Sequence, residues 1–217
     1  MRVRPAGIAA LAVALFICRP AFALPLSLDE IASVCGSGAG PENCGRRIEA
    51  VQLKRLPDLA KRDGATLVVS LFPAGSTSFV DAEAQGHERT YSLYDYLSEI
   101  NAVVLYVTDG TDASFVLLQR ATGRRTELPA DPRLSPDRQN LVTSDFCTSR
   151  CSSEIAIWHV TRDGVYRTHS WRPSATWSDA MATWKDAGTV TIEYTVAGQA
   201  TSAVLERRLA DSDWARH

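Results

Sequence analysis

Short apolar runs separated by turn residues fill the chain from about residue 51 onward. The runs are rich in Val, Ile, Leu and aromatic residues, and Gly, Pro, Asp and Thr cluster between them. This spacing is typical of antiparallel strands joined by tight turns. The strands that it predicts are 66–72, 90–96, 102–107, 114–118, 125–128, 140–146, 154–160, 165–171, 189–195 and 202–205. We therefore expect a mainly β fold, an antiparallel meander of small sheets.

Helical character is confined to residues 27–50. Ser27 or Asp29 can cap a short turn that runs through Val34, and Pro41 can open a second short helix that runs into Ile48. The glycine-rich link between them prevents one longer helix. The sequence predicts a helical N-terminal segment followed by strands, all within a single domain over residues 24–217.

The clearest local unit is a hairpin whose turn contains Asp163-Gly164. Regular alternation would give one face of this hairpin the residues Ala156, Trp158, Val160, Val165, Arg167, His169 and Trp171. The other face would then carry Ile155, Ile157, His159, Tyr166, Thr168 and Ser170. On this interpretation the two histidines of the hairpin point to opposite sides and cannot bind one metal ion together.

Two stretches between residues 100 and 196 repeat the order strand, turn, strand, turn, strand. Their hairpin glycines, Gly123 and Gly164, are 41 residues apart, and a period near forty is typical of propeller blades. The turn Leu134-Ser135-Pro136-Asp137 resembles the Ser-Pro-Asp-Gly turn of TolB-type and WD-repeat-like β-propeller blades. Arg138 replaces the glycine of that turn, and the second stretch lacks the Ser-Pro pair.

This resemblance implies a small or incomplete β-propeller, because a chain of this length holds at most four blades. It also implies a protein that binds partners, since propellers of this kind mostly do so. A β-sandwich built from similar hairpins is the alternative fold.

The first 23 residues have the pattern of a removable export signal. An uncharged apolar run over residues 6–18 follows two arginines, and Ala21-Phe22-Ala23 supplies the small residues that precede a signal-peptidase cut. The run is too short to span a bilayer core of about 30 Å as a helix. Lipidation at Cys18 is an alternative, although Ile17 stands where lipoprotein signals carry a small residue. We expect a periplasmic or secreted protein with no transmembrane segment after cleavage.

Cleavage would leave 194 residues and a mildly acidic chain. The signal holds three of the 23 basic residues and none of the 25 acidic ones, so 20 basic and 25 acidic residues remain, a formal charge of −5. Such a surface offers no electrostatic reason to bind nucleic acid or anionic lipid.

Four cysteines remain after the signal, namely Cys35, Cys44, Cys147 and Cys151. In an oxidising compartment they can form three pairings. The local pairs 35–44 and 147–151 are the simplest, because each closes a small polar loop, whereas a pairing between the two regions would close a longer loop and stabilise more. Zinc or Cu(I) binding and thiol exchange are the other uses, and the spacing favours structural disulfides over them.

No short motif for catalysis is present. The sequence lacks the Gly-x-Ser-x-Gly elbow, the phosphate loop, the dinucleotide fingerprint and the His-Glu-x-x-His helix. His87 lies in a polar loop, and the two hairpin histidines and His217 show no metal-binding spacing. We therefore expect no catalytic residue, no metal and no cofactor.

Tryptophans gather in the last third of the chain, with arginines beside them. Trp158 and Trp171 are expected to pack on a sheet, whereas Trp177 is predicted to lie exposed in an inserted loop over residues 174–179. Exposed Trp and Arg side chains dominate recognition surfaces. We therefore predict a binding surface formed by Trp177, Arg172 and Trp184.

The function predicted from the sequence is that of an exported binding module without catalysis, whose partner is an envelope protein or a glycan. Two alternatives belong to other classes. One is an exported hydrolase whose acid and base come from distant loops, and the other is a thiol- or copper-handling protein that uses Cys147 and Cys151.

Overall fold

The computed structural model describes residues 26–36, 40–84, 87–147 and 151–217. The predicted signal, and with it the alternative at Cys18, lies outside these residues. Strands make up 51% of the described residues and helices 14%, so the prediction of a mainly β fold is confirmed.

Four antiparallel sheets follow one another along the chain. The first contains β1 (Ala60–Asp63), β2 (Thr66–Ser70) and β3 (Ser76–Val80). The second has the order β4 (Ala82–Ala84), β5 (His87–Leu97), β6 (Ala102–Asp109), β7 (Asp112–Gln119) and β8 (Arg125–Leu128). The third has the order β16 (Ala215–Arg216), β12 (Val165–Trp171), β11 (Glu154–Val160), β10 (Asn140–Asp145) and β9 (Arg133–Leu134). The fourth contains β13 (Trp177–Trp184), β14 (Thr189–Val196) and β15 (Ser202–Arg208).

Consecutive sheets pack face to face, and a separate apolar core fills each of the three interfaces. The unbroken apolar run of β6 explains the central place of the second sheet. Val103 and Leu105 enter the core shared with the first sheet, whereas Val104 enters the core shared with the third. Both faces of such a strand are buried, so its sequence shows no polar alternation.

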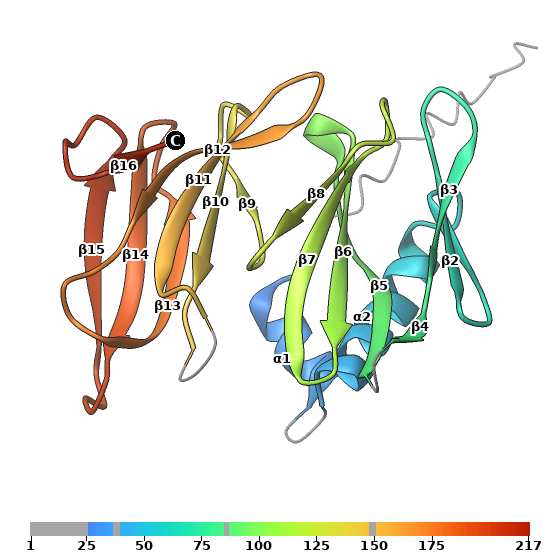
Figure 1. The fold of residues 1–217 in the computed structure, drawn as a ribbon, viewed down its shortest axis with the longest axis horizontal. Helices are drawn as coiled ribbons and strands as arrows, with labels where there is room; N and C mark the ends of the chain where they lie inside the picture. Colours follow the sequence, from blue (N-terminus) through green and yellow to red (C-terminus); the bar gives the residue numbers. More distant parts are fainter. Residues whose placement is uncertain (1–25, 37–39, 85–86, 148–150) are drawn as a thin grey trace, which may run out of the picture.

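The sheets form an open row, with the first and the fourth at opposite ends of the long axis (Figure 1). Face-to-face stacking in chain order is what the propeller resemblance implies, but the described strands close no barrel and the arrangement is sandwich-like. The propeller therefore stays a prediction.

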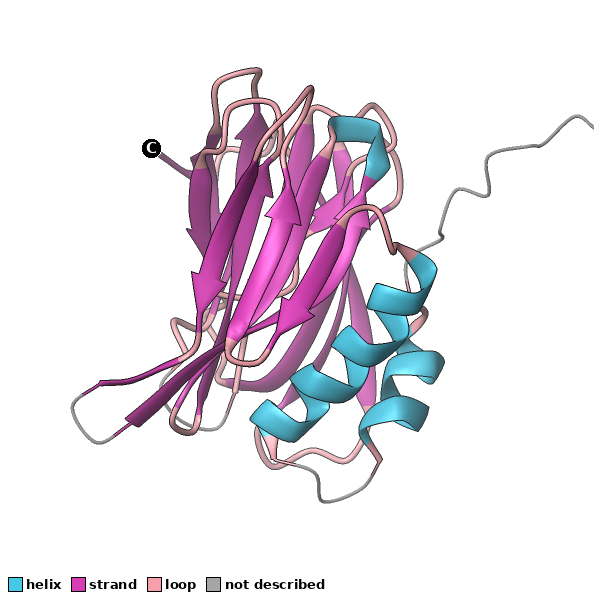
Figure 2. Cartoon of the chain, turned by 90° about the vertical axis from the view of Figure 1, so that its right-hand side faces the viewer, coloured by secondary structure: helices cyan, strands magenta, loops and turns pink. Residues whose placement is uncertain are grey.

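Two helices lie next to one another along one side of the strands (Figure 2). Helix α1 (Leu28–Cys35) begins at a capping box in which the Ser27 hydroxyl accepts from the Glu30 backbone N–H and the Glu30 carboxylate accepts from that of Ser27. Helix α2 (Pro41–Arg55) starts with proline in its first turn. It runs five residues beyond the predicted limit of 50, because Gln52 is buried and donates to the Tyr94 backbone oxygen of β5.

The hairpin of β11 and β12 contains a bulge that the sequence did not reveal. Trp158 pairs with Arg167 as expected, but the register shifts between Ile157 and Trp158, and Thr168 is the additional residue. Beyond the bulge Trp171 pairs with Ile155. The predicted faces are thus correct near the turn and wrong beyond Thr168, where the alternation of β12 changes sides.

Candidate functional site

The prediction that Trp177 is exposed is wrong. Its side chain is 6% exposed, because residue 177 begins β13 and pairs with Val196 instead of lying in a loop. The indole stacks on Tyr194 with ring centroids 3.9 Å apart and contacts Trp171 edge to face at 5.5 Å. Trp177 therefore belongs to the core between the third and fourth sheets, where burial of a large apolar ring stabilises the fold.

The other two residues of the predicted binding surface lie in different surroundings. Arg172 follows β12, with a side chain 68% exposed and its Nε 3.5 Å from the Glu154 carboxylate. Trp184 ends β13 and donates through Nε1 to the Arg133 backbone oxygen at 2.8 Å. Trp177 and Trp184 occupy opposite ends of one extended strand, roughly 20 Å apart at about 3.3 Å per residue. The structure does not bring the three side chains into one surface.

The bulge also overturns the reason given for separating the hairpin histidines. His169 of β12 pairs with Ile157 of β11. His159 lies two residues after Ile157 on β11, so the two histidines belong to one face of the hairpin. Their contacts nevertheless differ, since His159 is 3.3 Å from the Asn140 side-chain oxygen and His169 packs edge-on against Trp214. Over the described part of the chain, no three His, Cys, Asp or Glu side chains are grouped to hold a metal ion.

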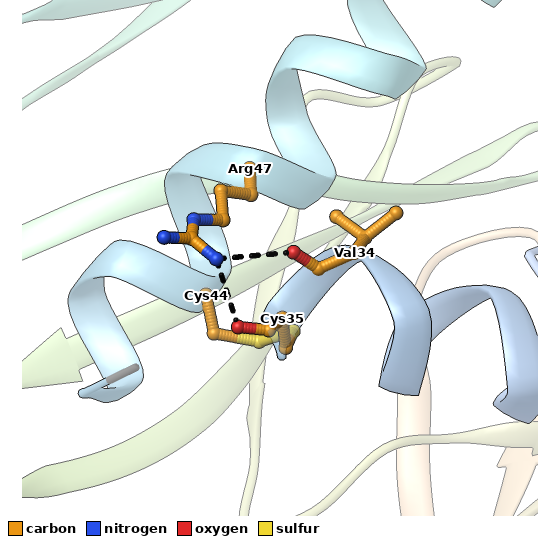
Figure 3. Close-up of a disulfide and its surroundings, with 4 residues drawn as sticks. All are labelled: Val34, Cys35, Cys44 and Arg47. Atoms are coloured by element: carbon orange, nitrogen blue, oxygen red, sulfur yellow. Dashed lines mark hydrogen bonds between the residues drawn. A yellow bond between two sulfur atoms is a disulfide. The ribbon is translucent and has the colours of Figure 1, made fainter. Parts of the chain in front are cut away.

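The cysteines form the two local disulfides, Cys35–Cys44 and Cys147–Cys151, with Cα atoms 4.6 and 5.5 Å apart. The pairing between the two regions is therefore not adopted. Figure 3 shows how Arg47 reinforces the first disulfide by donating to the Cys35 backbone oxygen at 3.0 Å, near the end of α1. Two disulfides fit a protein of an oxidising compartment, and paired sulfurs offer no thiolate to Cu(I).

Most buried charges are structural pairs. Glu49 of α2 accepts from Arg62 at 2.7 Å and from the Leu93 backbone N–H at 2.9 Å. Asp81 accepts from Arg62 at 3.0 Å and from Arg46. The network ties α2 to the first two sheets, and each carboxylate has basic partners, as buried charges require.

Two carboxylates at the junction of the second and third sheets have raised pKa values. Burial raises the pKa of Asp95 to about 6, helped by the charge of Asp131, against the hydrogen bond from the Tyr96 backbone N–H. Burial also raises the pKa of Asp131, although Arg133 at 2.6 Å and the Tyr94 hydroxyl favour its ionised form. Perturbed carboxylates mark functional sites only where a substrate can reach them, and neither lines the pocket described next.

A pocket of about 250 Å³ lies where α2 ends. Its lining comprises Arg55, Leu56, Pro57, Asp58 and Leu59 from the end of α2 and the following turn, with Tyr96 of β5 and Arg120 after β7. The segments that meet here are far apart in the sequence, because the first and second sheets pack together beside the helix. The pocket combines apolar walls with a few polar groups, as ligand sites do.

Arg120 is the best-positioned polar group of the pocket. Its Nε donates to the Ser70 backbone oxygen at 2.7 Å, and its Nη1 donates to the Asn101 side-chain oxygen at 2.9 Å and to the Tyr96 hydroxyl at 3.2 Å. The guanidinium also lies over the Tyr96 ring, 5.5 Å from its centroid. All of these partners are neutral, and within the described residues Arg120 has no carboxylate partner and Nη2 makes no hydrogen bond.

Sequence reasoning did not single out this site. Arg120 precedes the turn at Gly123, which was identified only as a turn, and its acceptors Ser70 and Asn101 are 50 and 19 residues away. Asn101 has a positive φ of 49°, a conformation that Asn adopts more readily than most residues. In the sequence, the asparagine at this corner is the local sign of a turn, and it does not indicate the arginine.

Comparison with known families and with curated proteins finds no match for this chain. Among the described residues, none of the helices combines the length and the apolar character needed to cross a bilayer. The candidate site therefore stands on its geometry.

Proposed function

We propose that this protein is an exported binding module, periplasmic or secreted, whose ligand presents an anionic group to Arg120. The observation that carries the proposal is a half-buried guanidinium that is fixed by neutral acceptors in a pocket and lacks a carboxylate partner among the described residues. An arginine N–H forms a charge-assisted hydrogen bond with an anion such as a carboxylate. Here the Nη2 group stays available for such a bond.

The fixed orientation of Arg120 favours binding. Three hydrogen bonds already hold the side chain, so a ligand does not have to immobilise it, and ordering costs of about 0.5–1.5 kcal/mol per flexible side chain are reduced. The described residues that line the pocket include no serine, cysteine or histidine, and Asp58 is the one carboxylate in the lining. A binding role fits this chemistry better than hydrolysis does.

The test uses the substitution Asn101→Asp, which places a carboxylate next to the Arg120 guanidinium. Aspartate is close in shape to asparagine and tolerates the positive φ, so the fold should be kept and its melting temperature should not fall. Acetate serves as the probe, and the resonance of the Arg120 Nε–H follows its titration.

The native chain should show a saturable shift in millimolar acetate, and Asn101→Asp should weaken binding at least ten-fold, about 1.4 kcal/mol. The control is Gln139→Glu, which adds the same charge at an exposed residue outside the pocket lining and should leave the titration unchanged. The proposal fails if acetate, phosphate and sulfate all give no saturable shift, or if Asn101→Asp binds like the native chain.

A further inference from the structure

Two further charged residues line the same pocket: Arg55, which forms a salt bridge with Glu30 at 2.8 Å, and Asp58. Asp58 is exposed in the turn after α2, and its carboxylate has no hydrogen-bond or salt-bridge partner among the described residues. It does not pair with Arg120, so the nitrogen and oxygen atoms of the two side chains are more than 4.0 Å apart. Asp58 and Arg120 are thus an acid and a base that remain separate within the pocket.

One residue contacts both Asp58 and Arg120. The Ser70 hydroxyl donates to the Asp58 backbone oxygen at 3.1 Å, and the Ser70 backbone oxygen accepts from Arg120 Nε at 2.7 Å. The turn of Asp58 is closed in addition by the Leu59 N–H, which donates to the Leu56 backbone oxygen at 3.0 Å. Ser70 therefore links the Asp58 backbone to the Arg120 side chain across the pocket.

Unpaired opposite charges in one small pocket favour a ligand that carries both signs. Two charges about 4 Å apart attract each other by only about 1 kcal/mol in a water-like medium. A molecule that bridges them forms two charge-assisted hydrogen bonds, each roughly twice as strong as a neutral one. The volume of about 250 Å³ lies below the range of about 300–1,000 Å³ typical of drug-sized ligands, so the molecule is small.

We propose that the pocket binds a small amino acid, with its carboxylate on Arg120 and its ammonium group on Asp58. This inference rests on the proposed function, because it assigns the anionic group to Arg120 and adds a second contact. It predicts selectivity that Arg120 alone does not supply, since acetate and a blocked amino acid offer the same carboxylate.

The experiment compares glycine, β-alanine and 4-aminobutyrate with their N-acetyl forms, using the Arg120 Nε–H resonance as before. This series places the ammonium group at increasing distance from the carboxylate. At least one free amino acid should bind ten-fold or more tightly than its acetylated form. In Asp58→Asn that preference should disappear, whereas binding of acetate should remain.

Asp58 is exposed, so its substitution does not endanger folding. The matched control is Asp63→Asn, an exposed aspartate of β1 that does not line the pocket, and the preference should survive it. If free and acetylated forms bind equally to the native chain, the amino-acid assignment is overturned while the anion site stands. If acetate, phosphate, sulfate and all of the amino acids fail to bind, the proposed function fails with it.

Discussion

Asp95→Asn should make the protein more stable at neutral pH, which is unusual for removal of a charge from a folded chain. Asp95 lies at a bulge in β5, partly buried, and its carboxylate accepts a hydrogen bond from the Tyr96 backbone N–H at 2.8 Å. Asparagine keeps an oxygen in that position. The substitution therefore removes the charge and retains the hydrogen bond.

The magnitude follows from the pKa. Burial first, and then the charges of Asp131 and Glu99, raise the pKa of Asp95 from 3.8 to about 6. The folded state therefore holds this proton more tightly than the unfolded state, and the stability from this group is complete below about pH 4 and is lost as pH rises through 6. At about 1.4 kcal/mol per pKa unit the loss at pH 7 is about 3 kcal/mol, an upper limit because the side chain retains contact with solvent.

Urea denaturation of both proteins from pH 4 to pH 8, with the disulfides intact, measures this difference. The two free energies of unfolding should be nearly equal at pH 4, and Asp95→Asn should exceed the native chain by about 1–3 kcal/mol above pH 7. Asp186→Asn is the control of opposite sign, because the Gly188 N–H lowers the pKa of that exposed carboxyl. A stability difference for Asp95→Asn that does not change with pH would refute the reasoning.

Three further substitutions test other parts of the structure by the same unfolding measurement. Trp177→Ala should lower the free energy of unfolding by about 3–5 kcal/mol, as expected of a buried ring, whereas a loss below about 1 kcal/mol would support the exposed loop that the sequence predicted. Replacing Cys35 and Cys44 together by serine should cost about 2–3 kcal/mol through the small loop that they close, and an unchanged midpoint would contradict this. Glu49→Gln should cost roughly 3–5 kcal/mol because it leaves Arg62 without its closest carboxylate, and a neutral result would show that the network adds no stability.

The local pattern predicted the strands well because most of them pair with a neighbour in the sequence. The run 102–107 became β6, and residues 154–160 and 165–171 became β11 and β12 with the predicted limits. The short edge strands were missed, since β1 and β3 carry polar residues on their outer faces and show little apolar character. Local propensity is a weak guide at such edges, where pairing with a central strand decides the structure.

Trp177 shows why the first site prediction failed. A tryptophan among Ser, Ala and Asp residues looks like an exposed anchor when only its neighbours in the sequence are considered. Its partners Tyr194 and Val196 lie on the next strand, and the pairing becomes visible only once β13 and β14 are aligned. Burial was therefore decided by tertiary packing and could not be derived from the composition of the segment.

The pocket escaped sequence analysis for a related reason. Ser70 ends β2, whereas Asn101 and Arg120 lie in the connections before β6 and after β7, and each would be solvated in isolation. The stacking of the first two sheets brings those connections to one corner, where the arginine receives neutral acceptors in place of a counter-ion. A charge held in this way keeps most of its attraction for an external anion, because no internal partner neutralises it. The most informative residue of this chain is therefore not the tryptophan that the sequence emphasises but an arginine whose significance depends on residues 19 and 50 positions away.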